Sequence, residues 1–343
     1  MEHAISRRSL LLSLPAAGLA SRALGQSTKP TIPVKGFSHM TLSVTDPQRS
    51  LEFYQGLFGM PIQARQGPLP SLRIGSGPQF IFLSKVAAGG KPGFNHWCVT
   101  TENFNVDRVI ATLAEHGIEK GDTKEPMKVR VRMRGPENGG AKDGTPELYV
   151  SDPDGILMQI QDVSYCGGAG KMGEVCLAKP EPAPGKGVLA MEDISHFTIF
   201  VSDSARAFEF YQSVFAMPVE AHQGPTPLLA VGPGGPFLTI AGGGGRGPGP
   251  MPSINHASFR MRGFETDKVM KALESYGIKP RPSDARGPAG PLVSYITLRM
   301  PNRGGAPDGT PELYFTDPDG ILLQIQDTTY CGGAGKLGEI CVP

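Results

Sequence analysis

Apolar positions in the first part of the chain follow two different spacings. Alternation of apolar and polar residues with period two predicts short strands, at residues 36–44, 61–66, 71–74 and 79–83. Between the first two of these, Leu51, Tyr54 and Phe58 recur at helical spacing and predict an amphipathic helix over residues 47–58. The order of elements is therefore strand, helix and three strands, a βαβββ unit.

A second unit of the same order begins at Phe94. The apolar stripe of its predicted helix is formed by Val106, Val109, Ile110 and Leu113. Gly117 is a usual stop for such a helix. The remaining strands are expected at residues 128–133 and in a hairpin that closes the unit.

The whole arrangement occurs twice. Residues 34–176 repeat as residues 189–341, and a Pro-rich linker separates them at residues 177–188. The chain therefore holds four βαβββ units in two modules. Cupped, mostly antiparallel sheets with helices on the outside make the predicted fold class α+β. The 46 glycines and 33 prolines agree with many short strands and turns.

The clearest repeat is the closing hairpin, which reads TPELYVSDPDGILMQIQD in the first module and TPELYFTDPDGILLQIQD in the second. Asp-Pro-Asp-Gly suits a tight β-turn. In the strand after the turn, alternation puts Leu157, Gln159 and Gln161 on one face and Ile160 on the other. Gln324 occupies the position of Gln159 in the second copy. A long amide in the middle of a strand, repeated at one offset, indicates a specific role.

The first 26 residues predict an export signal that lies outside the fold. Arg7 and Arg8 precede an apolar run that ends near Ala20, and small residues follow before Gln26. The paired arginines indicate a twin-arginine signal. The run is shorter than the roughly 20 apolar residues of a spanning helix. We therefore expect a periplasmic or secreted protein that has no contact with the membrane after cleavage.

Cysteine spacing agrees with an oxidising compartment. Four of the five cysteines lie in the repeated tails, as Cys166 with Cys176 and Cys331 with Cys341. Each tail could close its own loop, or Cys166 could pair with Cys331 across the modules. Cys98, in a predicted strand, is expected to be a small buried hydrophobe.

The charge of the chain gives no sign of two classes of partner. The formal net charge is +1, with acidic and basic residues interspersed. Neither a nucleic acid nor an anionic membrane surface is indicated by this balance. The expected partner is a small-molecule substrate, and the oligomeric state is left open.

Four of the seven histidines occupy matched positions in predicted strands. His39 and His196 lie in the first strand of each module, and His96 and His256 lie in the first strand of each second unit. Two imidazoles and one oxygen donor suit Fe, Mn, Zn or Ni, with positions left for substrate. A single histidine in a strand usually has a structural role. Four histidines at matched positions favour a role as metal ligands. We predict two divalent metal sites, formed by His39, His96 and Gln159 and by His196, His256 and Gln324.

Paired βαβββ units, a histidine in the first strand of each and the Asp-Pro-Asp-Gly hairpin together resemble the vicinal oxygen chelate superfamily of glyoxalases, bleomycin resistance proteins and extradiol dioxygenases. The resemblance implies the metal triads just named. The family's third ligand is usually Glu, where this chain has Gln159 and Gln324. An uncharged amide is a weaker donor, so metal affinity should fall, while the ion keeps its full charge for an anionic substrate oxygen.

Two further pairs of residues are candidates for catalysis. Tyr149 and Tyr314 precede the glutamines by ten residues and share a strand face with Glu147 and Glu312. The tyrosine resembles one that binds substrate in extradiol dioxygenases, although a strand tyrosine can equally pack its ring. A buried Glu with a raised pKa could act as general base.

The sequence favours a metal-dependent isomerase or lyase acting on an enolisable or catechol-like molecule. Ring-cleaving dioxygenase activity is an alternative, weakened because the regions around the hairpins carry no further histidine. A metal-free binding protein of bleomycin-resistance type and a pair of modules with only one active site are the remaining alternatives.

Overall fold

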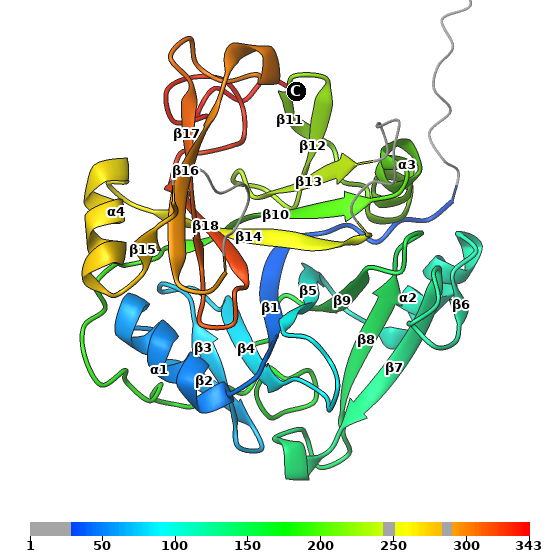
Figure 1. Ribbon diagram of the computed structural model, residues 1–343. Helices are drawn as coiled ribbons and strands as arrows, with labels where there is room; N and C mark the ends of the chain where they lie inside the picture. Colours follow the sequence, from blue (N-terminus) through cyan, green and yellow to red (C-terminus); the bar gives the residue numbers. More distant parts are fainter. Residues whose placement is uncertain (1–28, 243–250, 283–289) are drawn as a thin grey trace, which may run out of the picture.

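The computed structural model describes residues 29–242, 251–282 and 290–343. The expected signal, residues 1–26, lies outside the described residues. Each module forms one nine-stranded sheet, and Figure 1 shows the first module in blue to green and the second in green to red. No helix in the described ranges is long and apolar enough to cross a membrane.

The first module contains both of its predicted βαβββ units, with one short extra strand. Its elements are β1 (Gly36–Val44), α1 (Pro47–Phe58), β2 (Ile62–Gln66), β3 (Leu69–Arg73), β4 (Phe80–Lys85), β5 (Gly93–Thr101), α2 (Val106–Glu115), β6 (Glu119–Lys120), β7 (Lys128–Arg134), β8 (Thr145–Ser151) and β9 (Leu157–Asp162). The strand order is β2-β3-β4-β1-β5-β9-β8-β7-β6. The strands β1 and β5, which open the two units, are therefore neighbours at the centre of the sheet.

The second module repeats this arrangement element by element. Its elements are β10 (Asp193–Val201), α3 (Ser204–Phe215), β11 (Val219–Gln223), β12 (Thr226–Ala230), β13 (Phe237–Gly242), β14 (Ser253–Met261), α4 (Thr266–Ser275), β15 (Lys279–Pro280), β16 (Val293–Arg299), β17 (Thr310–Thr316) and β18 (Leu322–Asp327). The strand order β11-β12-β13-β10-β14-β18-β17-β16-β15 matches that of the first sheet. The predicted α+β class is confirmed.

Strand alternation divides each sheet into a core face and a cup face. In β1, Met40 and Leu42 are fully buried in the core, and His39 and Thr41 point into the hollow of the sheet. The core is continuous between the modules, where Phe37 packs edge-on against Phe197 with ring centroids 4.9 Å apart. Because side chains on the core face are buried by packing, only side chains on the cup face can contact a ligand.

The Asp-Pro-Asp-Gly turn of each module contacts the other module. Asp154 accepts hydrogen bonds from Ser202 N (2.9 Å) and Arg206 (2.7 Å), next to the start of α3. Below it, Asp152 accepts from Tyr211 of α3 at 3.1 Å. The turn of the second module makes the reciprocal contacts. Asp319 accepts a hydrogen bond from Thr45 N at 3.0 Å, and Asp317 accepts one from Tyr54 at 3.0 Å. The repeated turn therefore also joins the two modules.

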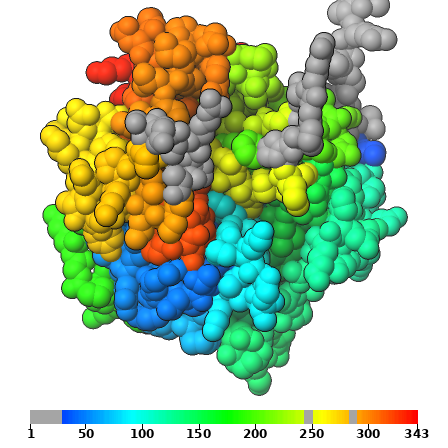
Figure 2. Space-filling view, in the orientation of Figure 1, coloured from blue at the N-terminus to red at the C-terminus, as the bar shows by residue number. Residues whose placement is uncertain are grey.

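Helices of the two modules lie side by side. Figure 1 places α1 directly below α4, and Tyr276 after α4 donates to the carbonyl of Phe53 in α1 at 3.0 Å. The space-filling view shows the blue residues of the first module in direct contact with the yellow and orange residues of the second (Figure 2). The linker also packs, because Glu181 pairs with Arg65 of β2.

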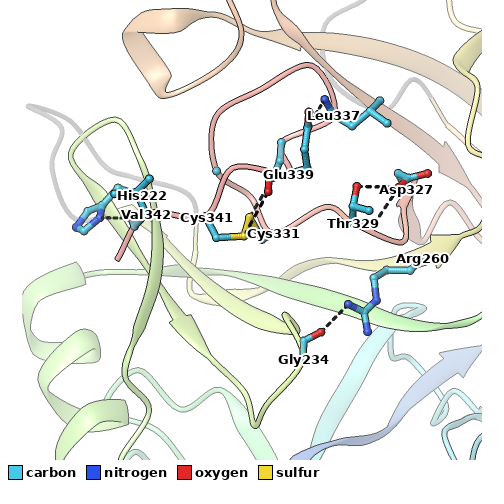
Figure 3. The surroundings of a disulfide bond; sticks show 12 residues. His222, Gly234, Arg260, Asp327, Thr329, Cys331, Leu337, Glu339, Cys341 and Val342 are labelled. Atoms are coloured by element: carbon cyan, nitrogen blue, oxygen red, sulfur yellow. Dashed lines mark hydrogen bonds between the residues drawn. A yellow bond between two sulfur atoms is a disulfide. The ribbon is translucent and has the colours of Figure 1, made fainter.

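Each Gly-rich tail is closed by a disulfide within its own module. Cys166 bonds to Cys176 and Cys331 bonds to Cys341, and the second bond is drawn in Figure 3. The alternative pairing across the modules does not occur. Cys98 is a free, buried thiol, as predicted.

Candidate metal centre

Adjacent central strands bring the first predicted triad together. In the antiparallel pair of β1 and β5, His39 and His96 approach with their Nε2 atoms 3.4 Å apart. Parallel pairing of β5 with β9 then places Gln159 beside them, with Oε1 2.9 Å from His96 Nε2. All three side chains are at most 5% exposed. The sequence prediction that two imidazoles and one amide share a point in the cup agrees with this geometry.

The outer nitrogen of each imidazole is held by the residue before it in the chain. His39 Nδ1 lies 3.1 Å from Ser38 Oγ, and His96 Nδ1 lies 2.8 Å from Asn95 Oδ1. Because the Asn95 oxygen only accepts, Nδ1 of His96 carries the proton and its Nε2 presents a lone pair toward the cup. The ring of His39 is also stacked on Phe80 at 4.4 Å. The ring orientations are thus fixed before any ligand arrives.

The second module repeats the constellation. His196 and His256 have their Nε2 atoms 3.3 Å apart, and Asn255 Oδ1 lies 2.7 Å from His256 Nδ1. Both polar atoms of the Gln324 amide are buried and have no hydrogen-bond partner of good geometry among the described residues. Ser195 supports His196 as Ser38 supports His39.

These residues fit a divalent ion. An ion about 2.1 Å from both Nε2 atoms, the usual metal–imidazole distance, would subtend roughly 105° between them, near a tetrahedral angle. Two Nε2 atoms 3.3–3.4 Å apart in each module, together with the buried Gln324 oxygen that has no donor among the described residues, suit an electropositive partner between them. No group of three His, Cys, Asp or Glu residues suited to a metal occurs within the described ranges, since the third donor here is Gln.

The histidines are neutral, as metal ligands must be. Burial lowers the pKa of His39 well below its usual range, and His96 as a neighbouring imidazole lowers it further. Burial lowers the pKa of His96 to about 4, with Arg132 and Arg130 contributing. The pKa of His256 is also lowered by burial to about 4. Each of these imidazoles is therefore uncharged at neutral pH and has one ring nitrogen with a lone pair that can bind a metal.

Glu147 is not the carboxyl with a raised pKa that the sequence suggested. Arg134, itself buried, donates to Glu147 Oε1 at 2.9 Å, and Arg132 donates to Oε2 at 2.7 Å. Burial acts to raise the pKa of Glu147, but the two arginines outweigh burial and hold the pKa below its usual range. The expectation was wrong because it did not include these cations, which come from the paired strand β7.

Tyr149 lies beside the candidate ligands. It is directly paired with Gln159 across the hairpin, its ring meets His96 edge-on at 5.2 Å, and its hydroxyl donates to Glu147 at 3.1 Å. Burial raises the pKa of Tyr149, so the phenol stays neutral and acts as a donor. In the second module Tyr314 meets His256 at 5.3 Å, and Glu312 pairs with Arg299.

Each triad opens into a cavity within the cup. The first cavity has a volume of about 450 Å³ and the second about 250 Å³. Both are lined by the triad, by the Tyr–Glu pair and by an additional tyrosine, Tyr165 or Tyr330. His116 and His222 line neither cavity. His116 contacts the carbonyl of Pro30, and His222 contacts that of Val342 (Figure 3).

A family model matches both modules, at residues 36–160 and 193–325. The chain belongs to the Glyoxalase/Bleomycin resistance protein/Dioxygenase superfamily. Members of this superfamily, also called the vicinal oxygen chelate superfamily, are often metal-dependent dioxygenases, glyoxalases or isomerases. No curated protein matches the chain in sequence.

Solved structures of superfamily members share the fold. A catechol 2,3-dioxygenase is 16% identical with a TM-score of 0.54, and 88% of each chain is covered. Homoprotocatechuate 2,3-dioxygenase from Brevibacterium fuscum, in complex with 3,4-dihydroxyphenylacetate, is 17% identical with a TM-score of 0.56, covering 88% of this chain and 83% of its own. An Mn(II)-bound glyoxalase from Novosphingobium aromaticivorans is 15% identical with a TM-score of 0.54, covering 86% and 82%. At these identities the likeness concerns the fold.

Sequence reasoning missed the cationic strand beside the superfamily site. Arg130, Arg132 and Arg134 alternate along β7, so all three point to one face of the sheet. Their spacing of two residues in the sequence could have indicated a strand with three cations on one face. The pairing of Arg132 and Arg134 with Glu147 follows only from the register of β7 against β8, in which Arg132 lies opposite Glu147.

Proposed function

We propose that this chain is a divalent-metal enzyme with one His-His-Gln site in each module. The observation that carries the proposal is the convergence, in both modules, of two imidazole Nε2 atoms and one buried amide at the floor of a cavity. His39, His96 and Gln159 would hold one ion, and His196, His256 and Gln324 the other. The metal remains one of Fe, Mn, Zn or Ni.

The substrate class is a small molecule with two vicinal oxygens, enolisable or catechol-like. A bound divalent ion supplies Lewis-acid polarisation of such a chelating pair. Because Gln159 carries no charge, a substrate oxyanion meets one more net positive charge than it would with Glu. This difference is worth about 4 kcal/mol at roughly 4 Å and an effective dielectric near 20, as an upper value.

The remaining residues bind and orient the substrate. The neutral hydroxyl of Tyr149 donates its one proton to Glu147, and it could bind a substrate oxygen beside His96 by turning that proton away from Glu147. Glu147 is the only carboxylate among the described residues that line the first cavity, and it is the candidate proton acceptor for isomerase or lyase chemistry. With its pKa lowered by two arginines, it would accept a proton only from a substrate carbon that is already strongly acidified.

Ring-cleaving dioxygenase activity is the second candidate. The position of Tyr149 and Tyr314 beside the triads, together with the catechol dioxygenases among the structural relatives, favours it. Against it, the described lining of each cavity contains only the two histidines of its own triad. Oxygen consumption with a catechol would separate it from an isomerase or lyase.

We also propose twin-arginine export to the periplasm or beyond. The two disulfides within the modules support an oxidising compartment. Replacing Arg7 and Arg8 by Lys should retain the precursor in the cytoplasm, and correct export of that variant would contradict the proposal.

Elemental analysis of the folded chain tests the main proposal. We expect two equivalents of metal per wild-type chain. Each of the variants His96→Ala and His256→Ala should retain one equivalent. His116→Ala, which alters a histidine far from both cavities, is the matched control and should retain both equivalents. A wild-type chain that folds but retains no metal in the presence of Fe, Mn, Zn or Ni would instead support a metal-free binding protein.

A further inference from the structure

The two candidate sites share their triads but differ in the strand beside them. Strand β7 reads KVRVRMR and its counterpart β16 reads VSYITLR. Arg130 and Arg132 of the first module are therefore matched by Tyr295 and Thr297 in the second. The last arginine of the strand is present in both modules, as Arg134 paired with Glu147 and as Arg299 paired with Glu312.

In the first cavity the two arginines lie next to the triad. Arg130 places its guanidinium carbon 4.7 Å from the centre of the Tyr149 ring, whose edge contact with His96 spans 5.2 Å. Arg130 donates to the neutral hydroxyl of Thr123 at 2.8 Å, and no carboxylate pairs with it among the described residues. The side chain of Arg132 is 51% exposed and shares Glu147 with buried Arg134.

The balance of charge in this cavity is therefore positive. One carboxylate, Glu147, faces two arginines, and Arg130 and Lys85 also line the cavity. Guanidinium groups suit carboxylates because their paired donors match the two oxygens, and a partly exposed group can reorient toward a ligand.

The second cavity has different surroundings, in which Tyr295 lies behind the lining residue Tyr314. Tyr295 stacks on Tyr314 with ring centroids 5.2 Å apart, and Glu312 pairs one-to-one with Arg299. Phe200 replaces Ser43 and Thr239 replaces Phe82, and the volume bounded by the described residues is about 250 Å³. Arg303, exposed at the rim, is the one cation among the described residues that line it.

We propose that the two modules take different ligands: the first site binds a chelating molecule that also carries a carboxylate, and the second binds a smaller, uncharged one. This inference rests on the proposed metal function and adds the substrate class of each site. Arg130 and Arg132 are the residues that make the distinction, because they line the first cavity and their described counterparts in the second module, Tyr295 and Thr297, carry no charge.

A matched pair of probes tests the distinction by binding alone. Catechol and 3,4-dihydroxybenzoate have the same vicinal oxygens and differ by one carboxylate. The full-length chain is loaded with Zn²⁺, which has no redox chemistry, and titrated by calorimetry. The His256→Ala variant isolates the first site, and His96→Ala isolates the second. We expect the first site to prefer 3,4-dihydroxybenzoate by about tenfold or more and the second to show no such preference.

Exchange of matched residues between the modules provides the control. Arg132→Thr in the first module should lose most of the preference, measured as the ratio of the two probe affinities in the same variant. Thr297→Arg in the second should gain a preference for the carboxylate, since the new guanidinium would lie beside Glu312 as Arg132 lies beside Glu147.

The outcomes separate the inference from the function on which it rests. Tight binding of both probes, with equal affinity at the first site, would overturn the inference and leave the metal site standing. Failure of both probes to bind at both Zn²⁺-loaded sites would contradict the chelating function, and the inference with it.

Discussion

Replacing Gln159 by Glu changes the charge of the third candidate ligand and almost nothing in its shape. Gln159 is 1% exposed, and its Oε1 lies 2.9 Å from His96 Nε2. One added charge at about 4 Å and an effective dielectric near 20 contributes roughly 4 kcal/mol, and desolvation of the carboxylate offsets part of it. We therefore expect metal affinity to increase by about 10- to 1000-fold.

Competition with a chromophoric chelator measures this change, in a His256→Ala background so that only the first module binds metal. Gln66→Glu is the matched control, because Gln66 lines the same cavity outside the triad. Gln324→Glu in a His96→Ala background should reproduce the effect in the second module. Unchanged affinity for Gln159→Glu, or an equal increase for Gln66→Glu, would refute direct ligation by the amide.

Three further predictions concern stability. Tyr54→Phe removes the donor to buried Asp317 and should lower the free energy of unfolding by about 1–3 kcal/mol in chemical denaturation. A change within error would mean that the turn does not join the modules energetically. Arg134→Met removes a buried partner of Glu147 and should cost about 3 kcal/mol in the same assay, and a neutral result would contradict its anchoring role. The pKa of His96 is about 4 when folded and about 6.5 when unfolded, so only the unfolded chain gains this proton between those values. Stability of the metal-free protein should therefore fall as pH decreases from 6.5 to 4, by about 3 kcal/mol for such a histidine. The pKa of Asp317, raised by burial to about 6, acts in the opposite direction, but four buried histidines outweigh the two turn carboxylates. Stability that rises over this range would refute the assignment of neutral buried imidazoles.

Much of the fold follows from local patterns in the sequence. Period-two alternation fixes which face of a strand a residue occupies, and the internal repeat supplies each pattern twice. For that reason the positions of His39 and Gln159 on a common face could be predicted without knowing how the strands pair.

Long-range register could not be predicted in the same way. The contacts of Asp154 with Ser202 and Arg206 join segments of different modules, and no local pattern encodes them. The two cations beside Glu147 were likewise visible in the sequence, but their effect on its pKa depends on the alignment of β7 with β8.

An anomalous-scattering map from crystals of the metal-loaded chain tests the central claim most directly. The account predicts two peaks per chain, each within about 2.0–2.2 Å of two imidazole Nε2 atoms and one glutamine oxygen. One peak should lie among His39, His96 and Gln159, and the other among His196, His256 and Gln324. Metal bound elsewhere, or imidazoles that hydrogen-bond directly to each other with no peak between them, would contradict it.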